Sequence, residues 1–130
     1  MYEQCTSIPG YGNLAVVGIY RPPNTSHDEF LSKMENILQV KTGVRFIMAE
    51  DFNLDLNKLN SSNHVNDYVN LMLTYSFKNV INVPTYILIF HPSDALCVEV
   101  DHMWHNLNIT EKSYIAYPSL ADHYFIAIVF

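Results

Sequence analysis

A strand–helix–strand succession occupies the first half of the chain and limits the folds open to it. Residues 14–20 (LAVVGIY) form an apolar, β-branched run, which predicts a buried strand that ends before Pro22 and Pro23. Apolar residues recur at helical spacing over 28–40, and a second apolar run, VRFIMA, follows at 44–49. This order predicts two strands joined by a helix that covers one face of a sheet.

The second half of the chain predicts one more helix and several short strands. Apolar residues at helical spacing predict a helix over 64–75. The further predicted strands are 80–83, 87–90, 96–104, 113–117 and 124–130. No repeat, low-complexity tract or linker interrupts the pattern. The sequence therefore predicts a single domain over 1–130, a mixed α/β sandwich of the α+β class.

The composition is apolar and acidic for a small domain. Hydrophobic residues make up 49% and charged residues 15% of the chain, whereas a charged share of about 25% is usual. The formal net charge of −6 argues against a basic stripe for tight duplex binding. Cys5 and Cys97 are too few for a disulfide scaffold, and neither a signal peptide nor a membrane span is visible. These features predict an intracellular protein, in the nucleus or the cytoplasm, that is not secreted.

Polar clusters stand at the ends of four predicted strands. They are Tyr20-Arg21-Pro22-Pro23, Asp51-Phe52-Asn53, Asp101-His102 and Asp122-His123. A carboxylate can hold a hard cation or orient an attacking water, and a histidine paired with an aspartate can donate to a phosphate oxygen. Each cluster taken alone is typical of a turn or of a surface loop. Their order and spacing together favour phosphoester chemistry.

The ordered set resembles a known family. The segments that carry the resemblance are GIYRPPN (18–24), MAEDFNLDL (48–56), VNDYVNLMLTYSFKNVINVPT (65–85), VEVDHMWHN (98–106) and LADHYFIAIVF (120–130). They are similar to the endonuclease/exonuclease/phosphatase superfamily, in the branch carried by LINE-like (non-LTR) retrotransposons. The resemblance runs from about residue 14 to the end of the chain and implies the C-terminal half of a four-layer αββα fold.

The resemblance also implies an activity, a cofactor and a partner. The family cleaves phosphodiesters with a divalent metal, usually Mg²⁺, and the retrotransposon branch nicks DNA. By motif, Tyr20 would contact the scissile phosphate. Asp51 would position the attacking water, and Asn53 would bind phosphate oxygens.

The later motifs carry the remaining implied roles. Asp101 would support the metal or orient the histidine network. Asp122 would orient His123, which would contact the scissile phosphate, and Thr85 would be a weaker phosphate contact. The implied metal ligands are Asp51 and Asp122.

Departures from the family pattern point to a weakened enzyme. The family's N-terminal half, which carries the principal metal-binding glutamate, has no counterpart here. Glu50 replaces the usual glycine, Tyr86 replaces an arginine and Ala121 replaces a serine. The resemblance thus implies a fragment of impaired or no activity. It also implies poor solubility, because without the N-terminal half an apolar sheet face is uncovered. Such a face would bind the N-terminal half or another copy of the chain.

Three other interpretations stay open at this stage. The first is a non-catalytic transposon remnant that binds a partner. The second is a phosphoesterase of the same superfamily with a non-DNA substrate, such as a lipid or inositol phosphate. The third is a zinc site formed by Asp101, His102, His105 and His123. The odd separation of His102 and His105 opposes it, since a strand would point them to opposite faces.

Overall fold

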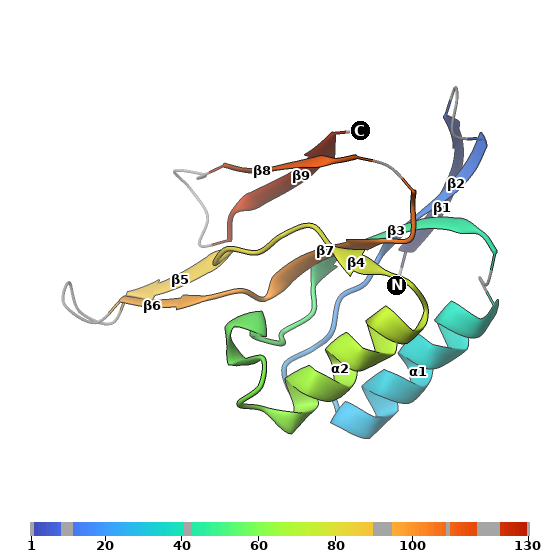
Figure 1. Ribbon diagram of the computed structural model, residues 1–130. Coiled ribbons are helices and arrows are strands. Elements are labelled where there is room, and N and C mark those ends of the chain that lie inside the picture. The colour runs from blue at the N-terminus through green and yellow to red at the C-terminus, as the bar shows by residue number, and fades with distance from the viewer. Residues whose placement is uncertain are drawn as a thin grey trace.

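The computed structural model contains a twisted five-stranded sheet with two helices on one face and a strand hairpin over the other (Figure 1). The structure describes residues 2–8, 12–40, 43–89, 95–108, 110–116 and 123–129. In these ranges the two helices are α1 (His27–Val40) and α2 (Asn63–Thr74). Neither combines the length and the apolar character that crossing a bilayer requires.

The five-stranded sheet has the strand order β1-β2-β3-β7-β4. Its strands are β1 (Tyr2–Ile8), β2 (Gly12–Gly18), β3 (Arg45–Asp51), β7 (Asp101–His105) and β4 (Lys78–Asn79). β2 and β3 are parallel and are connected through α1, whereas the other neighbours are antiparallel. Two separate hairpins complete the fold. They are β5 (Tyr86–Ile89) with β6 (Ala95–Val98) and β8 (Lys112–Ala116) with β9 (Phe125–Val129).

The main core lies between the sheet and the two helices. Side chains alternate across a strand, so every second residue of β2, β3 and β7 points toward the helices. The sheet contributes Ala15, Val17, Phe46, Met48 and Trp104, and the helices contribute Phe30, Met34, Leu38, Tyr68 and Met72. All of these are almost fully buried. Burial of such apolar surface, at about 25 cal/mol per Å², is what holds the helices to the sheet.

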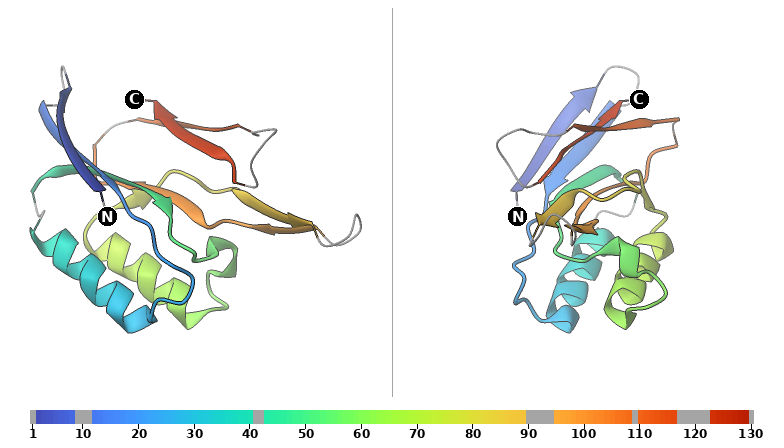
Figure 2. Two further views of the ribbon diagram at one scale, coloured as in Figure 1. Left: turned by 180° about the vertical axis from the view of Figure 1, so that it is seen from behind. Right: turned by 90° about the vertical axis from the view of Figure 1, so that its left-hand side faces the viewer.

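The opposite face of the sheet is only partly covered. Leu14, Ile47 and Met103 form a second core there, and isoleucines of β8 and β9 pack against it. Figure 2 shows this hairpin lying across the sheet from the helices. A groove of about 400 Å³ remains beside the hairpin, between residues such as Val16 and Ile126. The predicted open sheet face is therefore smaller than expected, because β8 and β9 cover part of it.

Most predicted elements are confirmed within two residues, with three exceptions. The predicted strand 80–83 is wrong, because only 78–79 pair with β7. The predicted strand 96–104 is interrupted at Glu99 and Val100, whose amides bond to the side chains of Asp55 and Thr85 instead of to a strand. The third exception is β1, which was not predicted and which pairs with β2 along its whole length.

The isolated chain should self-associate through the uncovered sheet face. Val16 lies on that face and is 38% exposed. We expect Val16→Lys to raise the monomeric fraction in analytical ultracentrifugation, because a charged side chain opposes burial of the face. Val40→Lys is the matched control, since Val40 is exposed on α1. An equal gain in the two variants, or a wild-type monomer with a sharp thermal transition, would contradict this expectation.

Candidate metal and phosphate site

Two carboxylates face each other at the edge of the sheet. Asp51 is the last residue of β3 and Asp101 is the first residue of β7, and the antiparallel register makes them direct partners. Asp51 lies four positions from Ile47 and Asp101 two positions from Met103, so both share the face of the second core, away from the helices. Like charges directly opposite each other on neighbouring strands destabilise a sheet. Their juxtaposition therefore calls for a compensating positive charge.

A histidine approaches this pair from a distant part of the chain. His123 Nδ1 lies 2.9 Å from Asp101 Oδ2 and 3.1 Å from Oδ1. Its backbone forms a bridge with Tyr86, and the two rings lie 4.5 Å apart. One ligand atom from each of Asp51, Asp101 and His123 falls within 4.8 Å of the other two. The fold thus brings together three residues that are far apart in the sequence.

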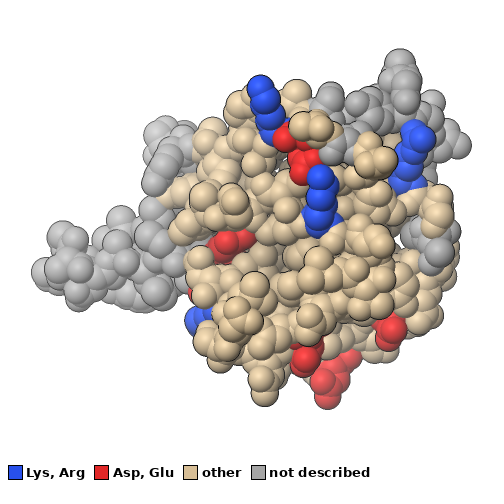
Figure 3. Space-filling view, viewed as in Figure 1, with Lys and Arg blue, Asp and Glu red and all other residues tan. Residues whose placement is uncertain are grey.

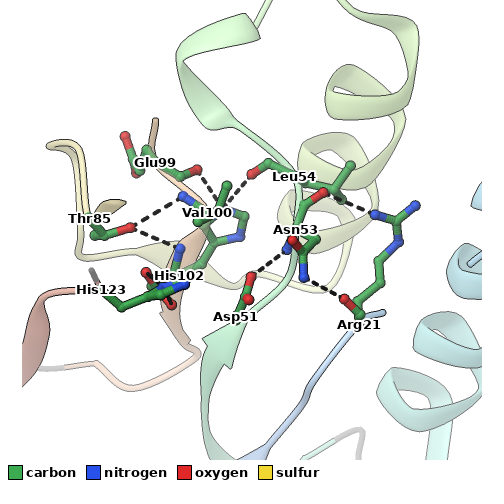
Figure 4. Close-up of polar contacts among 10 residues, drawn as sticks. Arg21, Asp51, Asn53, Leu54, Thr85, Glu99, Val100, His102 and His123 are labelled. Atoms are coloured by element: carbon green, nitrogen blue, oxygen red, sulfur yellow. Dashed lines mark hydrogen bonds and ion pairs between the residues drawn. The ribbon is translucent and has the colours of Figure 1, made fainter. Parts of the chain in front are cut away.

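The Asp51–Asn53 turn is held in place by Arg21 (Figure 4). Asn53 N–H donates to Asp51 Oδ1 at 2.8 Å, and its side-chain amide donates to the Arg21 carbonyl at 2.7 Å. In return, Arg21 Nη1 donates to the Asn53 carbonyl at 3.0 Å, and the Arg21 amide donates to the Asp51 carbonyl at 3.0 Å. Asn53 has φ +48°, a left-handed conformation that asparagine tolerates better than most residues. Arg21 thereby fixes the direction of the turn.

The sequence places Arg21 in a polar cluster with Tyr20 but predicts no role for it. Its side chain is buried, with the guanidinium 5.1 Å from the centre of the Phe30 ring, and Nη2 donates to the Thr25 carbonyl. Burial lowers the pKa of Arg21. An arginine before two prolines is typical of an exposed loop, so no local pattern indicates this burial. Only the packing of α1 against the loop reveals it.

The electrostatics favour a cation beside Asp51. Burial raises the pKa of this carboxyl, and the charge of Asp101 raises it further. The amide of Asn53 and the His123 ring act in the opposite direction. The ionised Asp51 is thus held at a cost in the folded protein, and a bound cation would remove that cost.

The remaining predicted site residues fall in different environments. Tyr20 is 57% exposed and lines a cleft beside α1, directly after β2. Thr85 is fully buried, and its hydroxyl accepts from the amides of Val100 and Asp101. A phosphate contact by Thr85 does not fit this burial, so we assign it to bracing Asp101. Asp122 and Ala121 lie outside the described residues.

The two histidines of the zinc interpretation do not converge. His102 lies in the helix-side core, where its ring stacks on Phe52, and Nε2–H donates to the Leu54 and Glu99 carbonyls. Burial lowers its pKa to about 4, so the ring is neutral. His105 instead accepts from the Leu107 amide and lies 3.6 Å from Glu111. In the described part of the chain, the only cluster suited to a metal is Asp51, Asp101 and His123.

The donor set of this cluster fits a divalent cation. Carboxylate oxygens suit hard cations such as Mg²⁺ and Mn²⁺, and an imidazole nitrogen is compatible with several metals. Asp51 keeps one oxygen free of the Asn53 amide, and His123 keeps Nε2 free of Asp101. Asp51 and Asp101 are the residues that would hold the ion.

Comparison with known proteins gives the family of the chain. The sequence model of the endonuclease-reverse transcriptase family matches residues 14–127. The chain belongs to the endonuclease-reverse transcriptase family. Among solved structures, it is similar to the endonuclease domain of TRAS1, a telomere-specific non-LTR retrotransposon, with a TM-score of 0.75 at 11% identity. The likeness covers 97% of this chain and 68% of the TRAS1 chain, and it shows that the two share a fold. No curated protein matches.

A buried glutamate near the site of this family member should make stability depend on pH. Burial raises the pKa of Glu99 to about 7, above an ordinary value of 4.5, so the folded state prefers the protonated form. Stability should therefore fall as the pH rises from about 4.5 to about 7, by at most about 1.4 kcal/mol per pH unit. Glu99→Gln should abolish this fall.

Urea unfolding at several pH values measures the effect. Glu35→Gln is the control, since Glu35 is exposed on α1. If Glu99→Gln and wild type lose stability in parallel between pH 5 and 7, the side chain is ionised throughout that range and the expectation is wrong.

Proposed function

We propose that this chain acts as a metal-dependent DNA endonuclease domain derived from a non-LTR retrotransposon. The observation that carries the proposal is the convergence of Asp51, Asp101 and His123 at one sheet edge. Family membership and the fold shared with the TRAS1 endonuclease domain support it.

Each residue of the site has a separate role in phosphodiester cleavage. Asp51 accepts a proton from the attacking water or orients it, and its raised pKa suits a proton acceptor. His123, held by Asp101, donates a hydrogen bond to a phosphate oxygen where negative charge develops. The Asn53 side-chain amide has a second N–H besides the one that donates to the Arg21 carbonyl, and this N–H and the exposed Tyr20 hydroxyl are further donors for phosphate oxygens. A role for Asp122 in orienting His123 remains a prediction from the resemblance.

The proposed cofactor is Mg²⁺, held weakly. When bound, it would polarise the phosphate and lower the pKa of water. Hard cations take about six oxygen ligands, and Asp51 and Asp101 supply only part of such a set. The resemblance assigns the principal metal ligand to a glutamate that precedes the motifs found here. We therefore expect saturation only at millimolar Mg²⁺, with weak cleavage by this chain alone or restored cleavage with a complementary N-terminal segment.

A second candidate, a non-catalytic remnant, is favoured by the surface charge. Figure 3 shows scattered Lys and Arg side chains on the described part of one face, without a continuous basic band. With a net charge of −6, non-specific attraction to the DNA backbone is weak. In this case the chain would keep the fold and lose the reaction.

Nicking of supercoiled plasmid separates the two candidates. Wild-type chain with 10 mM Mg²⁺, a magnesium-free reaction with chelator and the variant Asp51→Ala form the experiment. The proposal predicts nicked circles in the first reaction alone. Nicking that survives in Asp51→Ala, or none in any reaction even at 20 mM Mn²⁺, would favour the remnant.

A further inference from the structure

A cleft of about 450 Å³ lies between α1 and the loop that follows β2. Its buried floor is apolar and consists of Ile19, Phe30, Met34 and the half-buried Ile37. Its exposed rim is polar and includes Tyr20, Asn24 and Lys33. Clefts that bind small organic groups measure about 300–1,000 Å³ and combine an apolar lining with a few polar groups. The size and lining of this cleft meet both conditions.

One wall of the cleft contains a buried donor without an acceptor. Arg21 lines the cleft and is 7% exposed. Its Nη1 and Nη2 donate to the carbonyls of Asn53 and Thr25, whereas its Nε–H is buried with no partner among the described residues. A buried N–H without an acceptor is costly and uncommon in folded proteins. Nε is covered by the surrounding atoms, so an oxygen atom of a group bound in the cleft would supply the missing acceptor after a small rotation of the Arg21 side chain.

The charge of the cleft differs from that of the whole chain. Arg21 and Lys33 are two of the seven Lys and Arg residues, and both line it. The one carboxylate in the lining, Glu29, is paired with Lys33 at 2.6 Å. The cleft thus carries one net positive charge in a chain of net charge −6. A bound group with electron-rich oxygens suits it, and the apolar floor requires that the group also have an apolar face.

We propose that this cleft binds an unpaired nucleobase of single-stranded DNA. A base offers a flat apolar face to the floor, a second face to the exposed Tyr20 ring and a carbonyl oxygen to Arg21 Nε–H. Because Arg21 lines the cleft and is bonded in both directions to Asn53, a base held here adjoins the Asp51–Asn53 turn. The inference rests on the proposed function for the choice of DNA, and it assigns that function a preference for unpaired strand beside the cut.

Binding can be measured without cleavage. A single-stranded oligonucleotide with one 2-aminopurine, titrated with the chain in EDTA, reports stacking of that base through its fluorescence. Ile37→Trp fills the cleft and should weaken binding about tenfold, the scale of losing one stacked base. Val40→Trp on the same helix is the matched control, because Val40 is exposed and does not line the cleft.

Two further arms keep the test decisive. Asn24→Tyr blocks the exposed rim and should also weaken binding, which covers a failure of Ile37→Trp to fold. An oligonucleotide with abasic sites throughout, used as an unlabelled competitor of the 2-aminopurine oligonucleotide, should bind about tenfold more weakly than a competitor with bases. Equal affinity for the two oligonucleotides, or wild-type affinity in both filled variants, would overturn the proposal and indicate attraction to phosphate alone.

The outcome is separable from that of the nicking experiment. The fluorescence titration contains no divalent cation and therefore measures base binding in the cleft only, whereas plasmid nicking measures cleavage that depends on Asp51. Base binding without nicking would support the cleft and contradict cleavage. Nicking that depends on Asp51, with unchanged base binding in both filled variants, would support cleavage and contradict the cleft.

Discussion

Replacing Asp101 by asparagine should reduce plasmid nicking by about 100-fold or more. The carboxylate faces Asp51 across the sheet and accepts from His123, so the variant loses both a cation ligand and the partner that orients the imidazole. Asparagine keeps the shape and leaves the Thr85 contact to the backbone amide in place. The nicking rate against Mg²⁺ concentration measures the loss.

The same variant should be more stable than wild type without a cation. The charge of Asp101 helps to raise the pKa of Asp51, so ionising Asp51 opposes folding above the ordinary aspartate pKa. Removing one charge should raise the midpoint of urea unfolding at pH 7. Asp28→Asn, at an exposed position of α1, is the control. Full nicking, or a destabilised fold with nicking lost in proportion, would assign Asp101 a structural role instead.

Arg21→Met should lower both stability and nicking. The variant leaves the Asn53 and Thr25 carbonyls without their donors in a buried place, at a cost of about 2–3 kcal/mol. It also frees the turn that positions Asp51, and a displacement of about 1 Å at a reacting group can cost about 100-fold in rate. Urea unfolding and the nicking rate measure the two effects.

Two comparisons separate the effects of Arg21→Met. Arg45→Met removes the other arginine of the chain, which is exposed, and should change neither quantity. Arg21→Lys keeps one donor and should recover part of the rate with KM for plasmid unchanged. If Arg21→Met nicks at the wild-type rate whenever it is folded, Arg21 supports the fold and does not position the turn.

The spacing of apolar residues predicted the helices and the central strands, because these apolar residues pack into one core. The helical spacing over 28–40 and 64–75 matches α1 and α2 within a residue, since one stripe of each helix packs on the sheet. The short strand β4 was misplaced, because the side chain of Asn79 bonds to Ile81 and Glu99 at the point where the chain leaves β7. β1 was not predicted, because it is a strand through its pairing with β2 and not through a pattern in its own sequence.

The candidate site could be predicted in part. The order of motifs identified Asp51, Asp101 and His123, which the fold brings together. The role of Thr85 could not be predicted, since a threonine hydroxyl bonded to two backbone amides has no sequence pattern. The role of Arg21 could not be predicted either, because it bonds to Asn53, which lies 32 residues away. This contact depends on how α1 packs over the loop. Side-chain partners across the fold are the part that sequence reasoning lacks.

Titration with Mn²⁺, followed by the loss of the free-ion electron paramagnetic resonance signal, tests most directly whether Asp51 and Asp101 hold one cation beside His123. We predict one ion per chain with a dissociation constant in the millimolar range, competition by Mg²⁺, and about tenfold or greater weakening in Asp51→Asn and in Asp101→Asn. Unchanged binding in both variants, or no binding by the wild-type chain at 20 mM Mn²⁺, would contradict the assignment of these two carboxylates to a metal centre.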